Sequence, residues 1–212
     1  MYNPGISLAA TFERKTKMKN LKIATAQFEN KGGDKAYNLS VIEKLASKAA
    51  AQGADVIAFH ECSITGYTYA MPLSEQQMLD EAEYVPNGPS VQRLIEIARK
   101  YDIIILAGLF EIDTDGKIYK PQVCVDKNGL VAKHRKLHPF INDHINPGSE
   151  YTIFELHGWK CSILTCYDNN IIENVRAVKV LGADIVFMPH VTMCTPSTRP
   201  GRTRRTRSVS RP

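Results

Sequence analysis

A glutamate, a lysine and a cysteine each follow a segment with the pattern of a buried strand or hairpin. Cys166 comes after the strand-like run 159–165 and before a helical pattern, where a thiol can be exposed at the carboxyl edge of a sheet. Glu61 ends the apolar run 55–59, and Lys136 follows a predicted hairpin. A thiol nucleophile, a carboxylate that takes its proton and an ammonium that holds an oxyanion together suit covalent hydrolysis of an acyl group.

Each of the three residues has a plainer interpretation when it is taken alone. A cysteine in an apolar strand is usually a small core residue. Glu61 and Lys136 by themselves would be charges in water at the ends of strands. A shared catalytic role becomes the better interpretation because the three residues occur in one chain, in this order, each at the end of such a segment.

The elements around them predict an α/β fold with a largely buried sheet. Residues 36–52 carry one apolar helical stripe, consisting of Leu39, Ile42, Leu45, Ala46 and Ala49. A second helix is predicted from an N-cap at Ser90, with Val91, Leu94, Ile95 and Ala98 on its buried face. Short apolar strands alternate with these helices, which is typical of α/β proteins.

Further elements precede and follow the candidate residues. Residues 21–27 alternate like a strand with one buried face, and residues 103–110 are a continuous apolar strand. An Asn-Gly turn at 128–129 joins the arms of a predicted hairpin over 118–134. A polar loop over 135–150 follows. The pattern then predicts strand 159–165, helix 172–181 and strand 184–188.

Two stretches of the chain resemble each other. In 53–59 and in 182–188 the order Gly-Ala-Asp is followed by an apolar strand, and each glycine ends a predicted helix. The echo indicates either two similar halves or two ordinary helix-to-strand turns.

Length and composition argue against several classes of protein. The 212 residues suffice for one domain, and 43% hydrophobic with 23% charged residues is ordinary for a globular protein. The longest apolar run, 103–110, is far shorter than the roughly 20 residues that span a bilayer. The start lacks a signal-peptide core, so we predict a cytoplasmic protein. The five cysteines are odd in number and form no Cys-x-x-Cys, which argues against a zinc ribbon or a disulfide framework.

The net charge of +5 comes from the two ends of the chain. Six arginines lie in 199–212 without an acid, and the middle of the chain is mildly acidic. We therefore expect a disordered leader over 1–18, a domain over 19–196, and a non-native or disordered arginine-rich tail over 197–212. The acidic middle argues against nucleic-acid binding by the fold itself.

Three stretches carry a family resemblance: Glu61-Cys-Ser-Ile-Thr-Gly-Tyr67, His134-Arg-Lys136-Leu-His138 and Leu164-Thr-Cys166-Tyr-Asp168. With the strand around 24–28 and the strand entry at 182–184, they resemble the nitrilase superfamily of carbon–nitrogen hydrolases over roughly residues 20–196. The resemblance implies a four-layer αββα sandwich, a homodimer or larger oligomer, and a small-molecule amide substrate, with no membrane partner and no metal or organic cofactor.

The resemblance also implies roles for particular residues. Cys166 would attack an amide or carbamoyl amide and form a thioester, with release of ammonia or an amine. Glu61 would accept its proton and later activate water. Lys136 and the backbone N–H of Tyr167 would hold the oxyanion. Nitrile hydrolysis ranks below these reactions.

The sequence departs from the family pattern in three places. Asn170-Ile171-Ile172 stands where many members have Arg-Phe-Pro. The loop after Lys136 has Ile141 where many have a second glutamate; either Asp143 or His144 takes that role, or the role is absent. The family domain continues beyond the point where the arginine-rich tail begins, so we expect the C-terminal part to be missing. Candidate substrate contacts are His138, Asp143, His144 and His190.

The expected missing part leaves other functions open. A catalytically impaired remnant, or a non-enzymatic interaction protein on the same fold, would retain these motifs. A nucleic-acid binder working through the arginine-rich tail is a further alternative, because arginine runs bind phosphate. No aromatic residue interleaves that tail, however.

Overall fold

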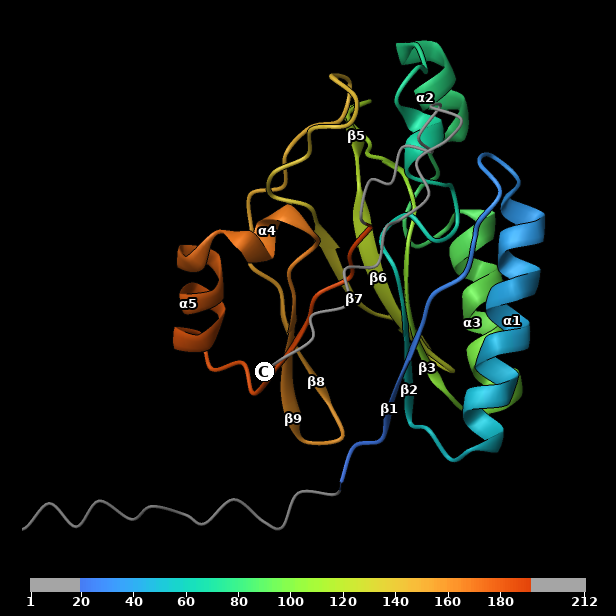
Figure 1. Ribbon diagram of the computed structural model, residues 1–212, viewed down its shortest axis with the longest axis vertical. Helices are drawn as coiled ribbons and strands as arrows, with labels where there is room; N and C mark the ends of the chain where they lie inside the picture. Colours follow the sequence, from blue (N-terminus) through green and yellow to red (C-terminus); the bar gives the residue numbers. More distant parts are fainter. Residues whose placement is uncertain (1–19, 192–212) are drawn as a thin grey trace, which may run out of the picture.

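The computed structural model describes residues 20–191, so the predicted leader and the arginine-rich tail lie outside the described residues. Two sheets pack face to face, and helices cover both outer surfaces (Figure 1). The predicted four-layer αββα sandwich is therefore confirmed. None of the helices in the described part of the chain is long and apolar enough to cross a membrane.

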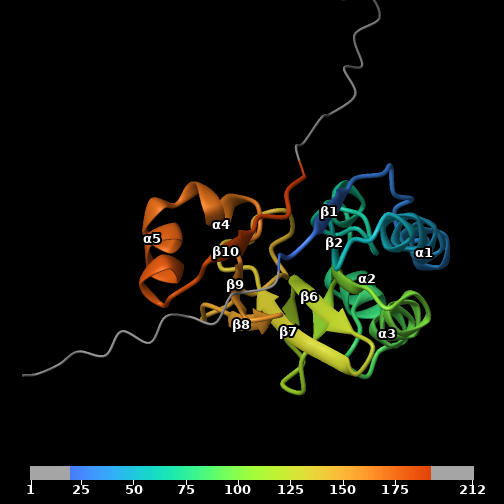
Figure 2. The same cartoon turned by 90° about the horizontal axis from the view of Figure 1, so that it is seen from below.

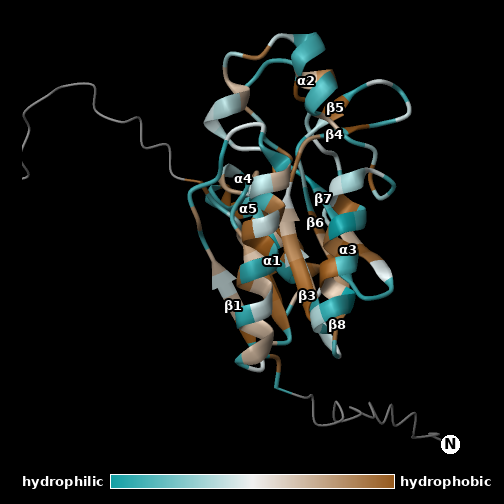
Figure 3. Ribbon diagram, turned by 90° about the vertical axis from the view of Figure 1, so that its right-hand side faces the viewer, coloured by the Kyte–Doolittle hydropathy of each residue, from teal (hydrophilic) through white to brown (hydrophobic). Residues whose placement is uncertain are grey.

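The first sheet has five strands in the order β1-β2-β3-β6-β7. β1, β2 and β3 run parallel, and the β6–β7 hairpin adds to β3 in the antiparallel sense. The helices α1 and α3 cover its outer face, and their ribbons alternate between hydrophilic and hydrophobic residues (Figure 3). The bounds are β1 Ile23–Ala26, α1 Lys35–Ala51, β2 Val56–Phe59, α3 Pro89–Tyr101, β3 Ile104–Gly108, β6 Pro121–Asp126 and β7 Gly129–Arg135.

The second sheet has three strands in the order β10-β9-β8. β10 pairs with β9 in parallel, and β8 pairs with β9 antiparallel. α4 and α5 form the outer layer on this side (Figure 2). The bounds are β8 Ile153–Leu156, β9 Trp159–Ile163, α4 Tyr167–Asn170, α5 Ile172–Val180 and β10 Ile185–Phe187.

Smaller elements lie between β2 and β6, at the end of the sandwich where the candidate residues are found. They are η1 Thr68–Ala70, α2 Glu75–Glu81 and the two-stranded pair β4 Glu111–Ile112 with β5 Ile118–Tyr119. The sequence interpretation did not anticipate α2, although Ser74 and Gln77 form a capping box at its start. β8 was also missed.

Apolar residues fill the space between the layers. Leu106 and Cys124 from the first sheet pack with Cys161, Ile163 and Phe187 from the second. Each fully buried Ile or Leu contributes about 2 kcal/mol by removing apolar surface from water. The predicted stripe of α1 faces the first sheet, with Ile42, Ala46 and Ala49 buried and Leu39 and Leu45 partly buried.

The predicted N-cap at Ser90 is wrong. α3 begins one residue earlier, at Pro89, and its N-cap is Gly88. The Ser90 hydroxyl instead donates to Glu83 Oε1 at 2.8 Å, and the Ser90 N–H donates to Glu83 Oε2 at 2.8 Å. The carboxylate of Glu83, seven residues earlier, thus satisfies the first turn of the helix in place of a side-chain N-cap.

The two resembling stretches have matching local structures. Gly53 ends α1 with φ +74°, and Gly182 follows α5 with φ +97°, a left-handed conformation that suits glycine. In each case the aspartate two residues later accepts a backbone N–H from the neighbouring parallel strand: Asp55 from Lys22, and Asp184 from Lys160. The similarity between the two stretches therefore extends beyond the turn to the parallel pairing of β1 with β2 and of β9 with β10.

Candidate active site

Glu61 lies in a buried cluster with two lysines. Lys136 Nζ donates to Glu61 Oε1 at 2.7 Å, and Lys120 Nζ forms an ion pair with the same oxygen at 2.6 Å. All three side chains are only about 1% exposed. Among the described residues, Glu61 Oε2 has no hydrogen-bond partner. One carboxylate oxygen is therefore held by two cations, and the other is free to accept a proton.

The cluster is built where several strands end. Glu61 follows β2, and Lys136 follows β7. The turn after Glu61 packs on β3 at Gly108, where a Cβ would lie 2.6 Å from Cys62 N. Ser63 Oγ accepts the Gly108 N–H at 3.2 Å, and Gly108 O accepts the Ile64 N–H at 3.0 Å. The absence of a side chain at Gly108 thus lets the Glu61 turn sit on the sheet.

Cys166 occupies a strained turn between β9 and α4. Its φ of +54° and ψ of −110° are unusual for a residue other than glycine and cost roughly 1–3 kcal/mol. Two hydrogen bonds hold the turn: the Cys166 N–H donates to Pro189 O at 2.8 Å, and Cys166 O accepts the Asn169 N–H at 3.0 Å. The thiol is nearly buried, with Val191 O 4.0 Å from Sγ. Such a turn fixes the direction in which a nucleophile points.

The charges around Cys166 favour a neutral Cys166 thiol and an ionised Glu61 carboxylate before the reaction begins. Burial would raise the pKa of Glu61, but Lys120 and Lys136 outweigh it and hold that pKa below its usual value. Burial raises the pKa of the Cys166 thiol, Glu61 adds to the rise, and Lys136 opposes it. The carboxylate is thus ionised and can take the proton when the thiol attacks.

Two donors lie beside Cys166. Lys136 is one of the charged groups that act on the thiol. The backbone N–H of Tyr167, the next residue along the chain, bonds no acceptor among the described residues. An ammonium and a free N–H at this place can stabilise the negative oxygen of a tetrahedral intermediate.

Asp168 links the cysteine turn to the lysine loop. Its buried carboxylate accepts backbone N–H groups from His138 at 2.9 Å, Leu137 at 3.1 Å and Thr165 at 3.3 Å. His134 Nε2 lies 3.5 Å from Oδ2. Burial would raise the pKa of Asp168, but His134 and the backbone donors outweigh it and lower the pKa. One carboxylate therefore joins the segments that carry Cys166 and Lys136.

We expect Asp168→Asn to destabilise the fold by about 3 kcal/mol at neutral pH, since a buried anion with several donors is lost. The folded pKa is lowered, so the stabilisation is fully present above the ordinary value of 3.8 and is lost as the pH falls through the lower folded pKa. Urea unfolding at pH 7 and near pH 3 measures this. Asp143→Asn, at an exposed position of the neighbouring loop, is the control and should change little. A pH-independent loss would contradict the account.

An aromatic rim borders the cysteine turn. The ring of Tyr167 contacts those of Phe140, at 5.9 Å between centroids, and His138, at 6.3 Å. Lys136 Nζ lies 5.2 Å from the Phe140 ring centroid. Phe140 and Tyr167 are each about half exposed. Of the predicted substrate contacts, His138 is therefore the one that lies at this rim.

Two further predicted substrate contacts, Asp143 and His144, lie in the same loop as Phe140. Asp143 is exposed, and His144 uses its backbone N–H to cap Asn142 Oδ1 at 2.9 Å. Ile141, at the position where many family members have a glutamate, is buried in an apolar cluster with Cys62 and Tyr67. The structure thus offers no carboxylate at that position.

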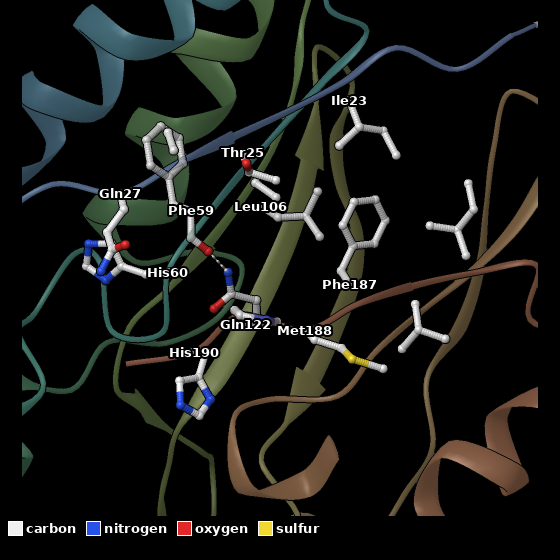
Figure 4. Close-up of a pocket in the computed structure, with 15 residues that line it drawn as sticks. Ile23, Thr25, Gln27, Phe59, His60, Leu106, Gln122, Phe187, Met188 and His190 are labelled. Atoms are coloured by element: carbon white, nitrogen blue, oxygen red, sulfur yellow. Dashed lines mark hydrogen bonds between the residues drawn. The ribbon is translucent and has the colours of Figure 1, made fainter. Parts of the chain in front are cut away.

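A cleft of about 450 Å³ opens between β1 and β10 (Figure 4). Ile23, Leu106 and Phe187 form apolar walls, and the polar residues at one end are Gln27, His60, Gln122 and His190. His190 lines this cleft, and its two neighbours in the chain, Pro189 and Val191, face the turn of Cys166. Neither Glu61, Lys136 nor Cys166 lines the cleft, so the side-chain geometry, and not this cavity, defines the candidate site.

Sequence reasoning missed Lys120 and gave Asp168 no role. Lys120 shares a face of the β5–β6 segment with Gln122 and Cys124, and all three are buried. A charged residue within an otherwise buried hairpin strand was the available signal. No group of three or more histidine, cysteine, aspartate or glutamate side chains in residues 20–191 could hold a metal ion.

Comparison with protein families finds the carbon–nitrogen hydrolase model matching residues 22–208. The chain belongs to the carbon–nitrogen hydrolase family. It is 29% identical to a nitrilase of Pyrococcus abyssi over 80% of this chain. It is 31% identical to the 2-oxoglutaramate amidase of Bacillus subtilis over 78% of this chain. Membership confirms the resemblance inferred from the three motifs.

Solved structures agree with this carbon–nitrogen hydrolase assignment. Nit3 of Saccharomyces cerevisiae, a member of the nitrilase superfamily, superposes with a TM-score of 0.71 at 26% identity over 81% of this chain. The chain spans 64% of the length of the Pyrococcus protein, 63% of the Bacillus protein and 65% of the Nit3 chain.

Proposed function

We propose that this carbon–nitrogen hydrolase cleaves the C–N bond of small amides through a thioester on Cys166. The observation that carries the proposal is the buried Glu61 carboxylate, with one oxygen held by Lys136 and the other without a hydrogen-bond partner among the described residues; Glu61 and Lys136 both act on the Cys166 thiol, which sits on a strained turn. The family assignment supports the same reaction class. The names of two relatives, an (R)-stereoselective amidase and a 2-oxoglutaramate amidase, favour amides as substrates.

The proposed first step forms the thioester. Cys166 Sγ bonds to the amide carbon while its proton passes to Glu61 Oε2, and the carbonyl π electrons move to oxygen. Lys136 Nζ and the Tyr167 N–H hold that oxyanion. When the carbonyl re-forms, the C–N bond breaks, and the amine leaves with the proton from Glu61.

The proposed second step releases the acid. Glu61 takes a proton from water, and the hydroxide oxygen bonds to the thioester carbon. The second tetrahedral intermediate is held by the same two donors. Its collapse breaks the C–S bond, and the proton returns from Glu61 to the thiolate. Two low barriers thus replace one high barrier.

Product analysis and adduct mapping test the proposal together. We expect the protein to release ammonia from primary amides and ω-amides and to carry an acyl group on Cys166 after rapid acid quenching. Peptide mass spectrometry locates the adduct. Carbamoyl amides and nitriles, run in the same panel, separate the three substrate classes.

Labelling by iodoacetamide distinguishes the enzyme from an inactive remnant or an interaction protein. Burial raises the pKa of Cys62 to about 12 and that of Cys161 to about 11, and it raises that of Cys124 as well, so these thiols should react slowly. Faster labelling of Cys166 near neutral pH indicates assistance by Glu61. Labelling of Cys166 no faster than of these three, with no ammonia from any amide, would refute the proposal. Homo-oligomer formation stays a prediction.

A further inference from the structure

Lys120 is a second buried cation at Glu61 and has no part in the reaction described above. Its Nζ lies 2.6 Å from Glu61 Oε1, the same oxygen that Lys136 contacts at 2.7 Å. A buried lysine is costly unless it is paired, so a second lysine on one carboxylate calls for an explanation.

Neighbouring groups fix the backbone of Lys120, and its ammonium lies against Glu61 and Tyr67. Lys120 lies between β5 and β6, directly before Pro121, which favours an extended backbone. Lys120 O accepts the Lys136 N–H at 3.0 Å, so the two lysines are joined through the backbone. Lys120 Nζ also lies 4.6 Å from the centroid of the Tyr67 ring, within reach of a cation–π interaction.

We propose that Lys120 is a positioning residue: it fixes Glu61 Oε1, directs Oε2 to the Cys166 proton, and keeps Glu61 ionised while Lys136 serves the substrate oxygen. The inference rests on the proposed hydrolase function. In the thioester state, Glu61 is a carboxylate again, and Lys136 is directed to the carbonyl oxygen. Without Lys120, that buried carboxylate would share its single cation with the substrate.

The charged and titratable groups that face Glu61 come from several elements. They are Lys120, Lys136, Cys166, Cys62 and Tyr67. Burial raises the pKa of Cys62 to about 12 and that of Tyr67 as well, so both stay protonated through neutral pH. Burial would lower the pKa of Lys120, but the attraction of the Glu61 carboxylate and its hydrogen bond to Lys120 are among the influences that outweigh burial and raise that pKa. Glu61 is therefore the group that titrates on the acid side.

The test compares Lys120→Met and Lys120→Gln with the wild type. Removal of the cation makes the Glu61 carboxylate less stable, so its pKa rises. The rate of Cys166 alkylation by iodoacetamide, measured by peptide mass spectrometry from pH 3 to 8, should fall along an acid limb whose midpoint lies about one pH unit higher in the variants than in the wild type. At a pH on that limb, the change is a roughly 10-fold slower reaction. The acid limb of kcat/KM should shift in the same direction.

The controls separate a charge effect from a structural one. Lys120→Arg keeps the charge and should leave the midpoint near the wild-type pH. Lys117→Met removes an exposed cation three residues earlier and should change neither rate nor midpoint. Urea unfolding of each variant gives the stability independently. A folded Lys120→Met or Lys120→Gln protein with an unmoved midpoint would overturn the proposal, even if it were less stable.

Failure of the Lys120 proposal can be told apart from failure of the proposed function. Alkylation does not require turnover, so the acid limb can be measured whether or not amides are hydrolysed. Loss of the limb in Glu61→Gln would assign it to Glu61. If the limb persists unchanged in Glu61→Gln, the base role of Glu61 fails, and with it the positioning role of Lys120.

Discussion

Cys166→Ala is expected to lose amide hydrolysis by roughly 10⁴-fold or more while the protein stays folded. Without Sγ, no thioester can form, and any remaining rate would come from water attacking a bound amide. The substitution should cost only about 1 kcal/mol of stability, because the thiol is small and its contact with Val191 O, at 4.0 Å, is weak. Ammonia release and urea unfolding measure the two effects.

Cys161→Ala is the matched control for this experiment. Cys161 lies five residues earlier, on β9, and its side chain packs between the two sheets. Its loss should lower stability and leave turnover per folded molecule unchanged. A purified, folded Cys166→Ala protein that hydrolyses amides at the wild-type rate would rule out the thioester route.

Glu61→Gln is expected to have two large effects. Turnover should fall by about 10³-fold or more, since an amide cannot take the thiol proton. The free energy of unfolding should also fall by about 3–5 kcal/mol, because two buried ammonium groups lose the anion between them. Steady-state kinetics and urea unfolding give the two quantities.

The double variant Glu61→Gln with Lys120→Met separates these effects. It removes one cation together with the anion, so it should recover much of the stability that Glu61→Gln loses. It should recover none of the activity, because the proton acceptor is still missing. Recovery of turnover along with stability would show that Glu61 acts through the fold and not as a base.

Much of the architecture could be predicted from residue patterns. The apolar stripe of α1, the runs of β2 and β3, and the Asn-Gly turn between β6 and β7 are local features of helix and strand formation. Their outcome depends on neighbours within one or two turns of chain. Elements whose pattern is weak locally, such as α2 and β8, escaped prediction.

Contacts beyond one helical turn or one strand could not be predicted in this way. Ser90 has the residue type of an N-cap, but Glu83, seven residues earlier in the loop before α3, accepts hydrogen bonds from its hydroxyl and its N–H. In the sequence, Ile141 was only the residue that replaces a glutamate in a polar loop. In the structure it is buried and packs in one apolar cluster with Cys62 and Tyr67.

The amino-acid sequence by itself determined the types and order of Glu61, Lys136 and Cys166, and the strands after which they come. Local propensity and apolar periodicity are enough for that. Only the tertiary structure decided that Lys120 joins Lys136 on one oxygen of Glu61, and that Asp168 ties the turn of Cys166 to the loop of Lys136. The physical reason is that a buried charge is tolerable only where partners from other strands meet it, and such partners carry no local mark in the chain.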